Sequence, residues 1–98
     1  MTVAVHFAAT APTESMPEIA RAFEKLKPLL AKSGAHERSE LLINHPERKV
    51  QFLVYFASFE ESHAFLKKHG DALMDPFRDM VDNVAGPFFL ALEGEIGE

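Results

Sequence analysis

The 98-residue chain contains no cysteine and no tryptophan. Without cysteine it can form neither a disulfide framework nor a thiolate site for metal or catalysis. No stretch approaches the about 18 apolar residues that a membrane-spanning helix needs, and nothing near Met1 resembles a signal peptide. We therefore expect a single cytoplasmic domain over residues 1–98 that does not cross a membrane.

Basic residues are few and scattered. The chain has ten Lys and Arg and fifteen Asp and Glu, which gives a formal charge of −5. There is no basic stripe of the kind that binds nucleic acid. The chain has five His, but His63 and His69 lack the i,i+4 spacing of a helical metal site. We expect no nucleic acid partner, no bound metal and no cofactor.

Apolar residues are abundant by contrast, and nine of them are Phe. The strongest pattern lies at 50–69. Residues 50–57 predict a strand that is apolar on both faces and therefore covered on both sides. Ser58 and Glu61 then match the Ser-x-x-Glu capping box, which predicts a helix to His69.

The remaining segments follow from the same rules of periodicity, capping and turn chemistry. A helix is predicted from Ser15, with Glu18 completing a capping box, and Pro28 should kink or shorten it. Gly70 should interrupt the second helix. In chain order the other predicted elements are a strand at 2–9, the first helix to 32, a strand at 38–44, a hairpin loop at 45–48, a helical piece at 75–83, a hinge at 86–87 and a strand at 88–93.

The order β-α-β-β-α-β predicts a ferredoxin-like α+β fold, in which a four-stranded antiparallel sheet carries two helices on one face. The other face also reads as largely apolar: His6, Gln51, Leu53, Tyr55, Phe89 and Ala91. Monomers rarely expose so large an apolar patch, and a second copy could cover it across a two-fold axis. We therefore predict a homodimer that closes an α+β barrel. The alternative is an open monomer with a shallow sheet surface.

A turn with the pattern aromatic-x-Ser-x-acid follows the central strand, with a helical His and then a Phe beyond it: Phe56, Ser58, Glu60, His69 and Phe77. His63 is the alternative match for the helical His. This layout resembles the dimeric α+β barrel superfamily over nearly the whole chain, and within it the antibiotic biosynthesis monooxygenase, or quinol monooxygenase-like, group. The resemblance implies a cofactor-independent monooxygenase that acts on a small aromatic or quinol.

Three residues are candidates for catalysis. His6 lies mid-strand and could remove a proton from a phenol, or its ring could fill space and bond to a neighbour. His69 could be a base or an axial ligand, or it could stabilise a helix C-terminus. Tyr55 could contribute a polar group to an apolar pocket, or could bond across a dimer seam.

Four further residues are predicted to bind substrate in the barrel interior: Asn44, Gln51, Leu53 and Phe89. Gln51 shares a strand face with Tyr55, and both could meet His6 across the sheet. His36 and His45 lie at loop ends, where we expect them to be solvated. Two functions remain open on these grounds. One is a monooxygenase, and the other is a non-catalytic ligand-binding or structural barrel.

Overall fold

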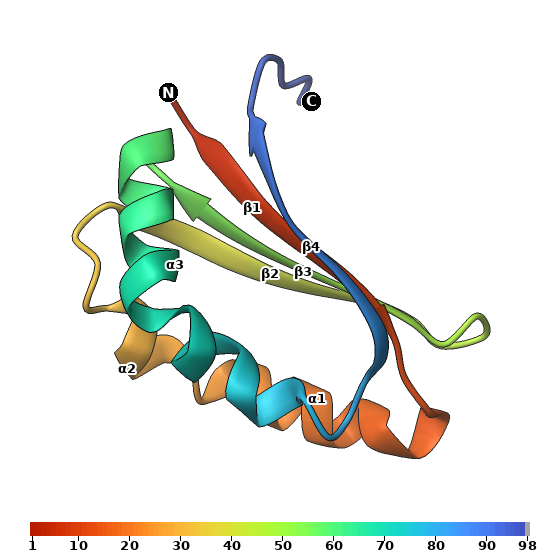
Figure 1. The fold of residues 1–98 in the computed structure, drawn as a ribbon. Helices are drawn as coiled ribbons and strands as arrows, with labels where there is room; N and C mark the ends of the chain where they lie inside the picture. Colours follow the sequence, from red (N-terminus) through yellow and green to blue (C-terminus); the bar gives the residue numbers. More distant parts are fainter. Residues whose placement is uncertain (98) are drawn as a thin grey trace.

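The structure, a computed structural model, describes residues 1–97 and shows an α+β fold (Figure 1). It confirms the predicted order of strands and helices. The elements are β1 (Val3–Thr10), the 3-10 turn η1 (Thr13–Ser15), α1 (Met16–Glu24), α2 (Lys27–Leu30), β2 (His36–Asn44), β3 (Lys49–Phe56), α3 (Phe59–Met74), the 3-10 turn η2 (Asp75–Phe77) and β4 (Asp82–Ala91). None of the helices within residues 1–97 is both long and apolar enough to cross a membrane.

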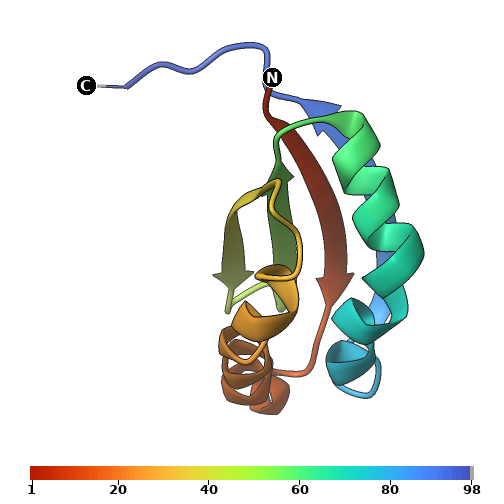
Figure 2. The ribbon, with the colours of Figure 1, turned by 90° about the vertical axis from the view of Figure 1, so that its left-hand side faces the viewer.

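The four strands form one antiparallel sheet in the order β2-β3-β1-β4. The helices cover one face of this sheet (Figure 1). Within that layer, α1 and α2 lie towards β2 and β3, whereas α3 lies towards β4 (Figure 2). Strands β2 and β4 are the two edges, so each of them has one side without a partner strand in the described chain.

The core lies between the sheet and the helices. Strand β3 supplies alternate buried residues to it, and the opposite residues of β1, such as Val5 facing Val54, are buried as well. Phe52 is the aromatic centre, because its ring lies 5.5 Å from the ring of Phe23 and 5.7 Å from that of Phe77. Truncating a buried Phe to Ala typically costs about 3–5 kcal/mol, so Phe52 anchors α1 and η2 to the sheet.

The predicted first helix is interrupted earlier than Pro28. Helix α1 ends at Glu24, and α2 begins at Lys27 with Pro28 in its first turn. Proline has no N–H to donate to the carbonyl of Glu24, but it fits the start of a new helix. The capping box expected at Ser15 is wrong. Ser15 has helical dihedral angles and makes no side-chain cap bond, because η1 leads directly into α1.

Helix α3 begins as predicted and ends later than predicted. The Ser58 hydroxyl accepts a hydrogen bond from the Glu61 amide over 3.1 Å. Gly70 does not interrupt the helix, which continues to Met74. A helical glycine costs only about 1 kcal/mol relative to Ala, and the helix gains the burial of Leu73, which is fully enclosed. His69 is therefore not at a helix C-terminus.

The segment after α3 also differs from the expected helix over 75–83. Only one 3-10 turn forms, and β4 starts at Asp82. The Gly86–Pro87 pair lies within this strand and is not a hinge between elements. Gly86 has φ +110°, and a Cβ there would lie 2.5 Å from the carbonyl oxygen of His6. A glycine is therefore required where β4 pairs with β1 in irregular register.

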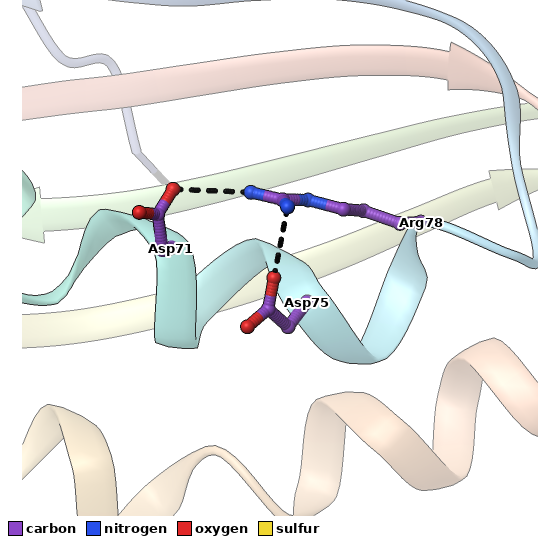
Figure 3. Close-up of polar contacts among 3 residues, drawn as sticks. All are labelled: Asp71, Asp75 and Arg78. Carbon is purple, nitrogen blue, oxygen red and sulfur yellow. Dashed lines mark hydrogen bonds and ion pairs between the residues drawn. The ribbon is translucent and has the colours of Figure 1, made fainter.

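Arg78 fixes the turn between α3 and β4 (Figure 3). Its two terminal nitrogens each lie 3.1 Å from a carboxylate oxygen, one of Asp71 and one of Asp75. All three side chains are largely exposed, so each ion pair contributes about 0–1 kcal/mol. The two pairs therefore contribute little to the stability of the fold.

Candidate active site in a groove beside β2

The open face of the sheet, on the side away from the helices, carries apolar side chains. Four of them are between 42% and 53% exposed: Leu42, Phe88, Leu90 and Leu92. Phe89 and Ala91 were expected on this face, and that expectation is wrong. They pair with Val5 and Val3, which are core residues, so they point towards the helices. The ring of Phe89 stacks on His63 at 4.0 Å. The register in which residues 88–91 pair with β1 sets this alternation, and the sequence does not reveal that register.

His6 lies in the middle of the open face. It pairs with Leu53 on β3 and with Phe88 on β4, and its ring centroid lies 6.1 Å from that of Phe88. Its Nε2 is buried and has no hydrogen-bond partner among residues 1–97. A buried polar nitrogen in this state costs free energy until it finds a partner.

Tyr55 is on the same face, but its hydroxyl is directed away from His6. It donates a hydrogen bond of 2.7 Å to Glu40 Oε1, and the Arg38 guanidinium lies 4.2 Å from the ring centre. The bond to Glu40 raises the pKa of Tyr55. The hydroxyl therefore stays protonated and serves as a donor, not as a base.

The predicted substrate-binding residues are spread over the same side and its edge. Gln51 is exposed and pairs with Ala8 and with Leu42. Asn44 closes the β2–β3 turn, where its Oδ1 accepts a hydrogen bond from the Glu47 amide over 3.1 Å. Asn44 therefore already has a hydrogen-bond partner within the turn. It is also four residues along β2 from Glu40, the β2 residue in line with Leu53 and His6.

His69 lies on the other side of the sheet. It is half-buried on α3, with its ring 5.1 Å from that of Phe65. The sheet separates it from His6 and Tyr55, which lie on the open face. The three residues predicted as catalytic therefore do not converge on one small molecule within a single copy of the chain.

A groove of about 350 Å³ lies where the break between α1 and α2 faces the edge strand β2. Its walls combine apolar side chains with a few polar groups: Phe23, Glu24, Lys27, Leu30, Ala31, His36 and Ser39. Both the volume and this mixture are typical of small-molecule sites. Sequence reasoning did not identify this groove.

His36 supplies the imidazole among the residues that line the groove. Its Nε2 lies 2.9 Å from Ser39 Oγ, and its ring meets the Phe56 ring edge-on at 6.1 Å. Burial lowers the pKa of His36, and a hydrogen bond to the backbone of Arg38 partly offsets that effect. The imidazole is therefore neutral near pH 7 and can accept a proton.

His36 lies at a loop end, as expected, because it is the first residue of β2. The expectation that it is solvated is wrong, because its side chain is half-buried. A register shift between His36 and Arg38 accounts for this burial. In a regular strand His36 would share a face with Arg38. The irregularity turns it to the helix side, where it meets Ser39. His45, in contrast, is exposed in the β2–β3 turn, as predicted.

Among residues 1–97, no three His, Cys, Asp or Glu side chains are grouped as a metal ion would require. No protein-family model matches the sequence, and no curated protein matches it. The fold, however, is shared with solved structures at low sequence identity.

A putative antibiotic biosynthesis monooxygenase from Nitrosomonas europaea is 11% identical, with a TM-score of 0.75 over 98% of this chain and 94% of that one. A mutant of SnoaB, a cofactor-independent oxygenase from Streptomyces nogalater, is 12% identical, with a TM-score of 0.76 over 99% and 98%. A mutant of MhuD with two manganese protoporphyrin IX molecules bound per active site is 16% identical, with a TM-score of 0.78 over the whole of both chains. The resemblance to the antibiotic biosynthesis monooxygenase-like proteins is thereby confirmed at the level of the fold.

Proposed function

We propose that this protein is a cofactor-independent monooxygenase that oxidises a small phenol or hydroquinone in the groove beside β2. The observation that carries the proposal is the half-buried His36, with a lowered pKa, bonded to Ser39 in a groove of about 350 Å³. Support of a different kind comes from fold neighbours that are described as monooxygenases or oxygenases.

The first step is removal of the phenolic proton. The substrate hydroxyl donates to Ser39 Oγ, while the Ser39 hydroxyl passes its own proton to His36 Nε2. The products of this step are a phenolate and an imidazolium. Lys27 and Glu24 both line the groove. The ammonium of Lys27 favours the phenolate, and the carboxylate of Glu24 favours the imidazolium.

Dioxygen is the oxidant, and the substrate supplies the electrons. A phenol and one dioxygen give a quinone and one water, and a hydroquinone and one dioxygen give a hydroxyquinone and one water. One oxygen atom enters the ring, as the new carbonyl of the quinone or the new hydroxyl of the hydroxyquinone. The other oxygen atom leaves as water with two hydrogens that the substrate releases. Phe23 and Leu30 provide the apolar walls that hold the aromatic ring.

The residues of the open sheet face have a different proposed role. We propose that two copies pair through this face and close an α+β barrel, burying His6, Leu53 and Tyr55 at the interface. The exposed apolar side chains Phe88 and Leu90 make that pairing favourable. A second copy also brings groups that could bond to His6 Nε2, which lacks a partner among residues 1–97.

The porphyrin of the MhuD mutant is not carried over to this chain. Haem iron in proteins is normally held by His, Cys, Met or Tyr. Among the residues that line the groove, His36 is the one of these types, and its Nε2 bonds to Ser39. In the groove His36 is therefore already paired with Ser39, and the reaction proposed above has no step that involves haem.

Oxygen uptake with a panel of phenols and hydroquinones tests the proposal. The wild-type chain should consume oxygen above the background autoxidation of each compound, and His36→Gln should not. His45→Gln is the matched control, because His45 is exposed in a turn. Binding of a panel member in the groove without oxygen uptake would favour the non-catalytic ligand-binding barrel instead.

A further inference from the structure

A second, smaller pocket lies between the sheet and the helices. Its volume is about 30 Å³, and all the described residues that line it are Ala, Val, Leu, Ile, Phe or Met. Ile19, Val50 and Phe52 form its buried part, and the exposed Val84 marks the side on which it meets the surface. It is too small for an aromatic ring and offers water no hydrogen-bonding side chain.

The pocket and the groove are neighbours. Phe52 lines the pocket, Phe23 lines the groove, and their rings meet edge to face at 5.5 Å. On β2 the groove residue Ser39 and the pocket residue Leu41 are two positions apart on the same face of the strand. The Phe23–Phe52 contact therefore lies between the two spaces.

We propose that this pocket binds dioxygen and supplies it to the groove past the Phe23–Phe52 contact. An apolar cavity of sufficient size stays dry and takes up small apolar molecules. Dioxygen is such a molecule, and a space of about 30 Å³ accepts only one or two heavy atoms. This inference rests on the proposed function, in which dioxygen is the co-substrate that takes the electrons of the phenol.

Dioxygen can be its own probe, because it is paramagnetic and speeds the relaxation of nearby protons. We would compare methyl proton relaxation under oxygen and under nitrogen pressure. The methyl groups of Ile19 and Val50 should relax several-fold faster under oxygen than those of Val54 and Leu73. All four residues are buried, but Val54 and Leu73 do not line the pocket. Equal enhancement in the two sets would overturn the proposal.

Ala9→Val should fill the pocket, since Ala9 lines it and pairs with Val50. The selective enhancement should then disappear. Ala85→Val is the control, because Ala85 is exposed and does not line this pocket. If Ala9→Val fails to fold, as added core methyl groups sometimes cause, Val84→Phe fills the pocket from its exposed side. Persistence of the enhancement in a folded filled variant would contradict the proposal.

Kinetics separate this inference from the proposed function. In the filled variant the KM for oxygen should rise several-fold, while the KM for the phenol stays as in Ala85→Val. An unchanged KM for oxygen in an active filled variant would contradict the proposal that the pocket supplies dioxygen to the groove. A wild-type chain with no oxygen uptake would remove the proposed function, while the relaxation data would still decide whether the pocket binds dioxygen.

Discussion

His36 Nε2 and Ser39 Oγ lie 2.9 Å apart on the helix side of β2. Two residues three apart in a regular strand point to opposite faces, so this contact exists only because the register of β2 shifts between His36 and Arg38. Irregularities of this kind in strands often re-aim a side chain next to a functional site. Here the shift directs an imidazole into the groove that α1 and α2 complete.

His36→Gln should remove the acidic limb of the pH profile of kcat/KM. In the wild-type chain kcat/KM should fall as the pH drops through the lowered pKa of His36, because the imidazolium cannot accept a proton. The variant should lose about 10²–10⁴-fold in rate and should show no limb in this range. Steady-state kinetics between pH 5 and 8 check this. An acidic limb that persists in the variant would assign the base to another residue.

Stability should also depend on His36 below neutral pH. Its pKa is lowered in the folded chain from the usual 6.5, mainly because burial disfavours the charged ring. Below 6.5 the unfolded chain therefore takes up the proton first, and the free energy of unfolding falls until the pH passes the folded-state pKa. Urea denaturation at several pH values should show a smaller decline for His36→Gln than for the wild type. The free energy of unfolding of His45→Gln should decline with falling pH as that of the wild type does.

Leu90→Asp should disrupt the proposed dimer. Leu90 is 53% exposed on the open sheet face, and pairing of two such faces would bury two uncompensated carboxylates. Sedimentation at micromolar concentration should give a dimer mass for the wild type and a monomer mass for the variant. Ile96→Asp introduces the same charge in the exposed tail and should leave the dimer intact. A monomeric wild-type chain would refute the pairing.

Ser58→Ala should lower the free energy of unfolding by about 1 kcal/mol. The variant loses the hydroxyl that accepts the Glu61 amide at the start of α3. Ser15→Ala is the matched control, because Ser15 also directly precedes a helix, α1, but makes no cap bond. The free energy of unfolding of Ser15→Ala, measured by urea denaturation, should differ from that of the wild type by only a few tenths of a kcal/mol. Similar losses in both variants would mean that the cap geometry is not the cause.

Gly86→Ala should destabilise the chain by more than about 1 kcal/mol. The new Cβ would lie 2.5 Å from the carbonyl oxygen of His6, at a residue with φ +110°. Backbone atoms cannot move aside as a flexible side chain can. Gly34→Ala, where nothing lies within 4 Å of the added carbon, should have little effect. Thermal denaturation of both variants would settle the comparison.

Local patterns in the sequence were enough to predict the layout. The apolar run at 50–57 identified β3, the Ser58–Glu61 spacing located the start of α3, and Pro46 with its polar neighbours marked the β2–β3 turn. Each of these signals acts between residues close in the chain. The ends were less certain, as with Gly70, because burial of Leu73 outweighs the local preference of glycine.

Local patterns did not predict the candidate site, because it depends on strand register and on contacts between distant segments. The sequence determined that this chain forms strands with two apolar faces and two helical segments to cover one of them, because hydrophobic spacing alone fixes which residues need burial. Only the tertiary structure decided that His36 faces the groove with Ser39, that Phe89 turns towards His63, and that His69 is on the opposite side of the sheet from His6. The physical reason is that a shift of one residue in strand pairing reverses the face of every side chain beyond it.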